Sequence, residues 1–541
     1  MIRNAHTDVL LIYPPEDYPE NGFHKDFQLN IGGVPLGILY IASHLRSNGI
    51  DVQLYDARID FNFESINKHN RREPFRFGAS DETIAQHIKR LKPKIVGVSS
   101  LFLNRINDAF HVCSLVKKID RNIMVVIGGP SCSILSLDIF NMCNDVDAIV
   151  LGEGEEVFLE LVRCCIDGRE LANIDSIVYR KGSQILYSKL TPAYVKDIDS
   201  VSEPDYHLVE LERYFQLSSM NLLARLTWCG DQMDRALSVT SSRGCPYKCI
   251  FCTRRLHNTN KWRAESPNRF VYRIRRLYEE FQITHFYIED DAWNISKKRF
   301  EEILDLMIKL DANFTWSAPN GIRAEGLSDE IVRKCVKSGC ISLQVGIESG
   351  DQKVLNKIVK KRLDLQKVKD GVKNCSKIGL DIGGFFMIGF PGESKVSIWR
   401  TLALALRLNF LYSCRIHLSI ATPYQGSELR KLAMDSGCLR TVRRRWNVRN
   451  ILLGAPKDNN FMEIIETSDF SFRFLSISQM LVNIVALATL VLRSLAYTST
   501  KKVKWAMAIR SFSQSKRVGA KGKLKSLLFR YLIFPKMVKR L

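Results

Sequence analysis

The stretch SSRGCPYKCIFCTRR, residues 241–255, brings three cysteines close together. Cys245 and Cys249 are separated by three residues, and Cys249 and Cys252 by two. The residues between the first two, Pro246 to Lys248, are typical of a polar turn, which argues against three unrelated core cysteines. A structural zinc site needs four ligands, and no fourth cysteine or histidine lies at zinc-finger spacing. Three thiolates can instead bind three irons of a [4Fe-4S] cluster and leave the fourth iron open to a ligand.

The cysteines directly follow the first of six strand-like segments that alternate with helical segments between residues 237 and 430. The six segments are ALSVTSSRG (236–244), HFYIEDDAW (285–293), FTWSAPNGI (314–322), SLQVGIESG (342–350), IGGFFMIGFPGE (382–393) and RIHLSIATPYQG (415–426). Helical stretches such as RFVYRIRRLYEEF separate them. Six strand–helix units predict a partial (β/α)6 barrel with its chemistry at the carboxyl ends of the strands.

Polar and small residues gather at those strand ends. They are Glu289, Asp290 and Asp291, then Asn320 and Arg323, then Glu348 and Ser349, and finally Gly389. Because parallel strands of a barrel end on the same side, we expect these residues to surround one opening together with the three cysteines. Tyr412, His417 and Tyr424, around the last strand, either contact a substrate or pack in the core.

The first 200 residues predict a different parallel sheet. Continuous apolar segments at 8–15, 51–57, 94–101, 122–130 and 147–156 alternate with helical ones, which is typical of a doubly wound sheet. Ligands of such a sheet lie at the carboxyl ends of its strands. Small residues occupy those ends and would let a bulky ligand approach the backbone, although ordinary turns explain them equally well. They are Ser99, Ser100, Gly128, Gly129, Gly152 and Gly154.

The length and composition indicate a folded protein of about three domains. The chain has 541 residues, of which 46% are hydrophobic and 25% charged, so disorder is excluded for most of it. Its 14 cysteines do not indicate disulfides, because the N-terminus lacks the layout of a signal peptide, and we expect a cytoplasmic protein. We expect a sheet domain at 1–200, a linker at 201–236, the barrel at 237–430 and a mainly helical C-terminal region at 431–541.

The C-terminal region is basic and partly apolar. The chain carries a formal charge of +22, and no acidic residue follows Asp469. Residues 474–492 form an uncharged run that is borderline for crossing a bilayer, so we expect a buried or interfacial helix. Residues 501–541 mix Lys and Arg with aromatic residues. This tail suits an anionic membrane surface, the phosphates of RNA or a solvated basic face.

The cysteine loop, with Phe251 just before its last cysteine, resembles the radical S-adenosylmethionine (SAM) superfamily. The resemblance extends across residues 237–430. It implies that Glu289, Asp290 and Asp291 receive the methionine ammonium and that Arg323, in NGIR (320–323), contacts the methionine carboxylate. It also implies that Phe251, together with Glu348 and Ser349 of GIESG (346–350) and Gly389 of MIGFPGE (387–393), helps to hold the rest of SAM.

The N-terminal zone resembles the cobalamin-binding domain that precedes this barrel in the cobalamin-dependent branch. Ser99, Ser100 and Leu101 are followed after 26 residues by Gly128 and Gly129, and LGEGEEVF (151–158) adds Gly152 and Glu153. These seven residues are the cobalamin contacts that the resemblance implies. The Asp-x-His-x-x-Gly motif that supplies an axial histidine is absent, and His24 lacks its flanking pattern, so we expect no lower histidine ligand.

The resemblance implies an enzyme that cleaves SAM reductively to a 5′-deoxyadenosyl radical and, with cobalamin, methylates an unactivated carbon of a small-molecule or lipid-like substrate. A cobalamin-dependent radical cyclase or rearrangement enzyme is one alternative. An RNA-modifying methylthiotransferase is another, although no further cysteine set precedes the barrel, so nucleic acid is not expected as a partner. A non-catalytic sensor would not need the SAM-binding groups. The expected partners are an electron donor of the flavodoxin or ferredoxin type and, through the tail, a membrane surface.

Overall fold

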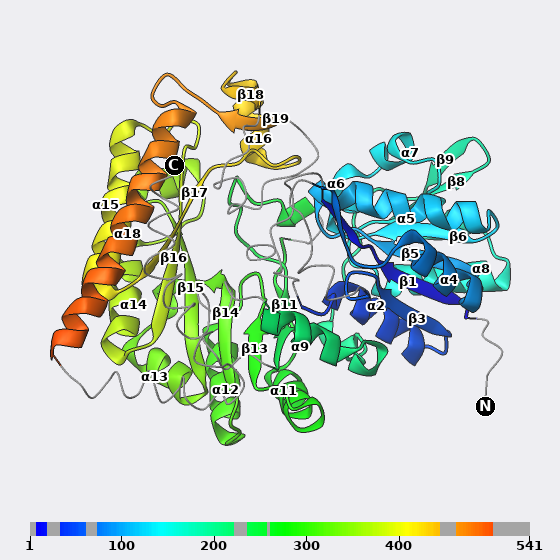
Figure 1. Ribbon diagram of the computed structural model, residues 1–541, viewed down its shortest axis with the longest axis horizontal. Coiled ribbons are helices and arrows are strands. Elements are labelled where there is room, and N and C mark those ends of the chain that lie inside the picture. The colour runs from blue at the N-terminus through cyan, green and yellow to red at the C-terminus, as the bar shows by residue number, and fades with distance from the viewer. Residues whose placement is uncertain are drawn as a thin grey trace.

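The computed structural model describes residues 7–18, 33–60, 73–220, 235–256, 260–443 and 461–500. The structure contains two mainly parallel sheets, each covered by helices, which lie side by side (Figure 1). The N-terminal sheet, blue to cyan, occupies the right of the view, and the second sheet, green to yellow, occupies the left. His24 and the tail at 501–541 lie outside the described residues.

The N-terminal sheet is the doubly wound sheet that the sequence predicted. Its strands run in the order β3-β1-β5-β6-β7-β8-β9, and the first five are parallel. The parallel strands are β1 (Val9–Tyr13), β3 (Val52–Asp56), β5 (Ile95–Ser99), β6 (Met124–Gly128) and β7 (Ala148–Val150). The chain order reverses between β1 and β5, which is where such sheets bind ligands.

Alternation along the strands explains why helices cover both faces of this sheet. In β1, Leu10 and Ile12 belong to one core, and Val9 and Leu11 to the other. The first core packs under α4 (Asp81–Leu91), α5 (Ile106–Ile119), α6 (Pro130–Leu135) and α7 (Asp138–Met142). The second packs under α2 (Leu36–Ser47) and α8 (Glu155–Asp167). Strands that are buried on both faces become continuous apolar runs, as the sequence has them.

Two antiparallel pairs extend this domain beyond the sequence prediction. β8 (Ile177–Lys181) and β9 (Gln184–Tyr187) form a hairpin at the β7 edge of the sheet. β2 (Glu16–Tyr18) pairs with β4 (Phe75–Phe77) apart from it. α9 (Leu211–Met220) lies in the segment expected as a linker, where Tyr214 donates a 2.7 Å hydrogen bond to Asp56 at the end of β3. The linker therefore packs on the sheet domain.

The second sheet is the predicted six-stranded barrel, left open between its first and last strands. All its strands are parallel, in the order β10-β13-β14-β15-β16-β17. They are β10 (Ala236–Val239), β13 (His285–Ile288), β14 (Thr315–Ile322), β15 (Cys340–Glu348), β16 (Asp381–Ile388) and β17 (Arg415–Ile420). The covering helices are α11 (Pro267–Phe281), α12 (Lys297–Lys309), α13 (Asp329–Lys337), α14 (Leu365–Ile378) and α15 (Lys395–Tyr412).

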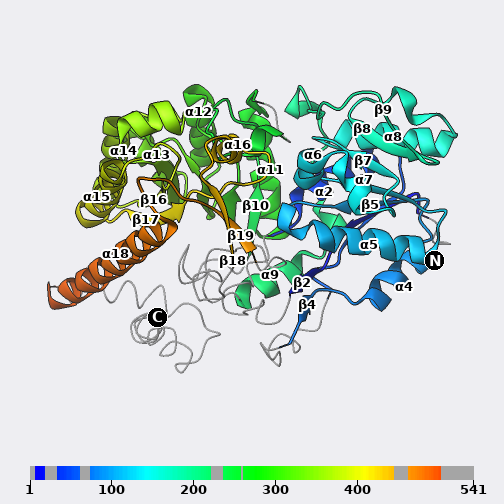
Figure 2. The same cartoon turned by 90° about the horizontal axis from the view of Figure 1, so that it is seen from above.

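The C-terminal region closes the side of the barrel near β17. α16 (Glu428–Asp435) is followed by a two-stranded sheet of β18 (Leu439–Arg443) and β19 (Phe461–Ile465). α18 (Phe472–Thr500) then runs beside β17 and α15, and its far end projects past the barrel (Figure 2). Leu475, Gln479 and Val482 of α18 are buried. The expectation of a helix over 474–492 is thus met, and no helix in the described part of the chain is long and apolar enough to cross a membrane.

Candidate active site

The three cysteines lie on a loop that neighbouring elements anchor at both sides. The loop begins after β11 (Ser242–Arg243), which pairs with β12 (Arg263–Ala264). Inside it, the backbone N–H of Cys252 donates to the carbonyl of Cys249 at 3.1 Å. The Ile250 N–H donates to Val359 at 3.2 Å, and the Ile250 carbonyl accepts from Leu429 at 2.8 Å. The turn that presents the thiols is therefore held by segments from two other strand ends.

The three cysteine thiols of this loop are not arranged around a single metal position in the described structure. Cys245, Cys249 and Cys252 are all free and partly buried. Among the described residues, no three Cys, His, Asp or Glu side chains gather around one metal position. Burial raises the pKa of Cys245 and raises that of Cys249 to about 12, against the opposing charge of Lys361. Metal binding at this loop must therefore release protons, as thiolate ligation requires.

Lys361 is a functional candidate that sequence reasoning missed. Its ammonium lies 2.6 Å from Glu348 Oε1, and its side chain is only 14% exposed. The Lys361 side chain passes over Gly346. A Cβ atom added at Gly346 would collide with the ammonium nitrogen of Lys361. Lys360 and Arg362 both have left-handed backbone, with φ of 60° and 52°. Such non-glycine conformations are costly, and here they turn Lys361 inward between two outward-pointing cations.

The structure separates the roles of the three predicted acidic residues. Asp290 is buried, and its carboxylate accepts from the backbone N–H of Ser241 at 2.7 Å and from the hydroxyls of Ser241 and Ser242. It therefore fixes the strand that leads into the cysteine loop. Asp291 is ion-paired with Arg254, which follows Cys252. Glu289 accepts a 3.2 Å hydrogen bond from Ser238, and burial raises its pKa.

Arg323 braces the cysteine loop from the end of β14. Its guanidinium stacks 4.1 Å above the ring of Tyr247, between the first two cysteines. It also pairs with Glu325 and donates to the carbonyls of Lys361 and Arg362, at 3.4 and 2.8 Å. These contacts connect the predicted carboxylate-binding arginine to the same segment that carries Lys361.

The remaining predicted SAM contacts lie at the ends of β15 and β16 and in the cysteine loop. Ser349 is fully buried, and its hydroxyl lies 3.1 Å from that of Thr401. Gly389 has φ of 95°, and Leu475 of α18 packs so close that an added Cβ would collide with it. Phe251 packs against Phe390, with ring centroids 6.1 Å apart. Ser349 and Gly389 are at the predicted strand ends, and Phe251 is in the cysteine loop. The side chains of Ser349 and Phe251 are directed into packing.

The interior face of the barrel is lined by polar side chains. Cross-strand contacts define this face: His285 with Ser317 at 3.1 Å, Arg415 with Ser342 at 2.8 Å, and the rings of Phe385 and His417 at 5.3 Å. Alternate strand residues point the other way into the core under the helices. Burial lowers the pKa of His417 to about 4, so this imidazole is neutral at physiological pH. His417 therefore faces the interior, while Tyr424 is exposed.

The carboxyl edge of the N-terminal sheet has the features of a site for a large ligand. Ser100 and Ser131 bury hydroxyls that have no hydrogen-bond partner among the described residues. Beside them, Leu101 and Phe102 are exposed by 44% and 57%. Gly129 has φ of 113°, and an added Cβ would lie 2.5 Å from the carbonyl of Ser100. Unsatisfied hydroxyls next to uncovered apolar side chains fit a group with both polar and apolar parts, as a corrinoid has.

Ion pairs connect this edge to the cysteine loop. Arg243, two residues before Cys245, pairs with Glu155 at 2.6 Å. Arg263 on the paired strand donates to both oxygens of Glu153, at 2.7 and 2.9 Å. Burial opposes ionisation, yet the two arginines hold the pKa of Glu153 below its ordinary value. Ser99, Gly128 and Gly152 end strands of the same edge, so the predicted cobalamin residues lie together, with the Glu153 carboxylate bound to the barrel.

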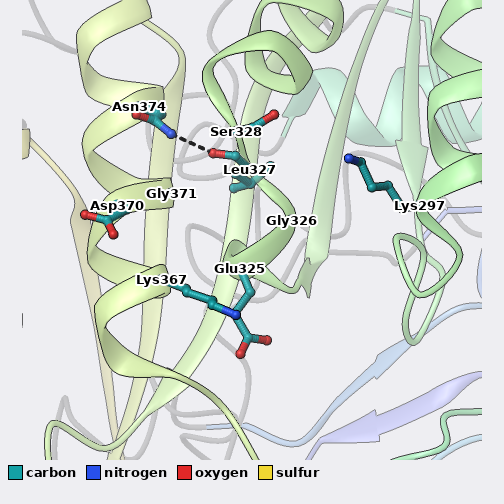
Figure 3. A pocket seen from close by; sticks show the side chains of 9 residues that line it. All are labelled: Lys297, Glu325, Gly326, Leu327, Ser328, Lys367, Asp370, Gly371 and Asn374. Atoms are coloured by element: carbon teal, nitrogen blue, oxygen red, sulfur yellow. Dashed lines mark hydrogen bonds between the residues drawn. The ribbon is translucent and has the colours of Figure 1, made fainter.

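A separate groove of about 250 Å³ lies outside this site, between α14 and the segment that begins α13 (Figure 3). Its polar groups are largely engaged with neighbours: Asn374 donates to the Leu327 carbonyl at 2.9 Å, and Glu325 pairs with Arg323. It contains none of the predicted cofactor residues. We assign it no ligand.

Protein-family models match both the N-terminal sheet domain and the barrel domain. The B12 binding domain model matches residues 32–162, and the radical SAM superfamily model matches residues 239–405. The chain thus belongs to the cobalamin-dependent, B12-binding-domain-containing radical SAM enzymes, and the cofactors of that family are a [4Fe-4S] cluster, SAM and cobalamin.

Curated relatives and solved structures agree with this family. An uncharacterised methyltransferase of Pyrococcus horikoshii is 29% identical over 80% of this chain and 84% of its own length. Cytidylyl-2-hydroxyethylphosphonate methyltransferase of Streptomyces wedmorensis is 26% identical over 74% of this chain and 78% of its own. The radical SAM methyltransferase TsrM of Kitasatospora setae, solved with cobalamin and a [4Fe-4S] cluster, superposes with a TM-score of 0.63 at 12% identity, covering 88% of this chain and 90% of TsrM.

Proposed function

We propose that this enzyme methylates an unactivated carbon of a small-molecule or lipid-like substrate. The observation that carries the proposal is the joint between its two domains. α6, which begins directly after the predicted cobalamin residue Gly129, contacts η7 (Arg254–Leu256), which follows Cys252. Ile134 of α6 and Leu256 of η7 also meet at Gly426, beyond β17. This arrangement supports a single reaction chamber that is bounded by the cysteine loop, the barrel opening and the corrinoid edge.

We assign different parts of SAM to different residues of the barrel. When bound, the cluster supplies the electron that cleaves SAM, and cobalamin supplies the methyl group. Cys245, Cys249 and Cys252 would bind three irons. Glu289 is the acidic residue that we assign to the methionine ammonium, since Asp290 and Asp291 are engaged in holding the loop. The positive charges of Arg323 and Lys361 complement the methionine carboxylate and would exclude competing cations.

On the N-terminal side, we assign the polar contacts of cobalamin to Ser99 and Ser100, and the close approach of its ring to Leu101, Gly128, Gly129 and Gly152. Ser131, which the sequence argument did not include, joins them through its unpartnered buried hydroxyl. Glu153 acts differently in this proposal. Its carboxylate is bound by Arg263 and accepts from the backbone N–H of Val195 at 2.7 Å, so it positions the corrinoid edge.

An external one-electron donor completes the reaction, and we propose that it contacts the segment 352–362. This run, QKVLNKIVKKR, carries five cations and no acidic residue. Lys353, Lys357, Lys360 and Arg362 are exposed, and Val359 of the same segment is hydrogen-bonded to the cysteine loop. An acidic carrier of the flavodoxin or ferredoxin type would be attracted to this basic segment, which contacts the cysteine loop.

The proposal is tested by anaerobic reconstitution of the full chain with iron, sulfide, hydroxocobalamin and SAM. We expect about four irons per chain, retained corrinoid, and 5′-deoxyadenosine together with S-adenosylhomocysteine when co-purified small molecules are added. A variant with Cys245, Cys249 and Cys252 replaced by alanine should lose the iron and keep the corrinoid. A product of unchanged carbon count would contradict methylation and indicate ring closure or rearrangement, and about eight irons would contradict a single cluster.

A further inference from the structure

Large apolar side chains that remain exposed gather on two neighbouring helices, α15 and α18. They are Val396, Trp399, Phe410 and Leu411 on α15 and Ile477, Met480, Leu481, Ile484 and Val485 on α18, each exposed by 39 to 67%. The helices pack together, with the rings of Trp399 and Phe474 6.3 Å apart. Both lie on the side of the barrel away from the N-terminal domain (Figure 1). We call these nine side chains the α15–α18 face.

The spacing along α18 explains how this face arises. Leu475, Ser478, Gln479 and Val482 form one stripe, which is buried against the barrel. The exposed residues of α18 recur on the opposite stripe, at intervals of three and four residues. A soluble surface helix normally has charged or polar residues there. Monomeric proteins rarely expose this many large apolar side chains on neighbouring helices, so the α15–α18 face is suited to an interaction.

The charges around the face indicate the chemistry of what covers it. Neither residues 395–412 nor residues 472–500 contain an acidic residue. Lys395, Arg400 and Arg407 are exposed on α15, although Arg400 also pairs with Asp351 at 2.6 Å. Residues 501–541, which follow α18, add thirteen Lys or Arg and no acidic residue. An apolar face with a rim of exposed cations on α15, followed in sequence by a basic tail, matches an anionic surface with an apolar interior.

We propose that the α15–α18 face docks on an anionic lipid bilayer. A second copy of the chain would match the apolar side chains but would bring cations against cations at the rim. Since no described helix combines the length and the apolar character needed to cross a bilayer, α18 would lie along the surface with its outer stripe in the headgroup region. The inference does not depend on the catalytic proposal, because it uses none of the cofactor residues.

The experiment measures vesicle binding of the full chain, without turnover. Vesicles of phosphatidylcholine with phosphatidylglycerol are compared with pure phosphatidylcholine, at low and high salt. We expect binding to the anionic vesicles that salt weakens. Replacing Trp399, Leu481 and Ile484 by serine should reduce it about tenfold or more, since the three side chains are exposed and their loss spares the core. The matched control replaces Tyr272, Val336 and Ile166 by serine. These three side chains are similarly exposed but lie outside the α15–α18 face.

Three outcomes would overturn the proposal. The first is full-length protein that stays in the supernatant with anionic vesicles at low salt. The second is a triple variant that binds as tightly as the unaltered chain, which would assign binding to another surface. The third is a concentration-dependent dimer that the triple variant loses while vesicle binding is unchanged, which would assign the face to self-association.

Discussion

The guanidinium of Arg263 donates to both carboxylate oxygens of Glu153, at 2.7 and 2.9 Å, and so joins the barrel to the carboxyl edge of the N-terminal sheet. Both side chains are only 9% exposed. Glu153 directly follows Gly152, and Arg263 lies on the strand paired with the one that leads into Cys245. The bidentate pair thus joins the Arg243–Glu155 pair in connecting this edge to the strands beside the cysteine loop.

The first prediction concerns this pair. Glu153→Gln removes the carboxylate charge from a buried ion pair with Arg263, so we expect a loss of about 3 kcal/mol in the free energy of unfolding. Urea denaturation of the full chain, followed by tryptophan fluorescence, measures it. Glu156→Gln is the matched control, because Glu156 is 61% exposed and lies 3.6 Å from His44. Equal denaturation midpoints for the two variants would contradict a stabilising role for Glu153.

A second prediction follows from the position of Lys361. Lys361→Met should weaken SAM binding about tenfold or more while the iron content stays unchanged, because the ammonium opposite Glu348 would be lost and the cysteines would not. Equilibrium binding of SAM to the reconstituted protein measures it. Lys360→Met, which alters the neighbouring side chain that is paired with Glu428 at the surface, provides the control. If both variants bind SAM equally, Lys361 has only a local structural role.

The third prediction tests the donor surface. Replacing Lys353 and Lys357 by glutamate should slow cluster reduction by flavodoxin about tenfold at low salt, since steered association depends on complementary charge. Reduction by dithionite should be unchanged. The cluster signal in electron paramagnetic resonance follows both reactions, and anisotropy of labelled flavodoxin reports binding directly. The same charge change at Lys89 and Lys118, on the N-terminal domain, is the control.

Two results would reject the donor surface. One is an equal loss with flavodoxin and dithionite, which would indicate damage to the cluster site. The other is a flavodoxin rate that matches the control, which would place the donor elsewhere. Neither bears on whether SAM is cleaved, so the catalytic proposal is tested separately.

Much of the architecture could be predicted because buried parallel strands produce continuous apolar runs in the sequence. All six barrel strands and the five parallel strands of the first sheet were predicted from such runs. The hairpin of β8 and β9 was missed, because an edge hairpin that is partly exposed leaves a weaker signal. The apolar run at 474–492 indicated a helix, but the sequence alone did not show which stripe would meet β17.

The site was harder to predict than the fold because partners distant in sequence decide each role. Glu289, Asp290 and Asp291 are adjacent acids, yet one shares the interior face with Ser238 and the next binds the loop serines. Strand alternation was the available signal for that difference. For Lys361 the sequence contained no such signal. Its inward direction depends on left-handed backbone at Lys360 and Arg362, and neither position is a glycine that would have indicated that conformation.

The fourth prediction concerns Glu393, which supports the turn that contains Gly389. One carboxylate oxygen accepts from the backbone N–H groups of Gly389 and Phe390, at 2.7 and 2.9 Å. The other oxygen is buried with no hydrogen-bond partner among the described residues. Burial raises the pKa of Glu393 from 4.5 to about 7. The folded protein therefore keeps this proton to a higher pH than the unfolded chain does.

The stability that comes from the neutral form of Glu393 is complete below pH 4.5 and is lost as the pH rises to about 7. A shift of this size corresponds to about 3 kcal/mol. Glu393→Gln stays neutral, so its stability relative to the unaltered chain should increase by about that amount across the same interval. Urea midpoints from acidic to mildly alkaline pH measure the difference, with Glu330→Gln, at an exposed position, as the control. Parallel curves for the Glu393→Gln variant and the unaltered chain would show that Glu393 is already ionised in the folded protein, held by the two N–H groups of its turn.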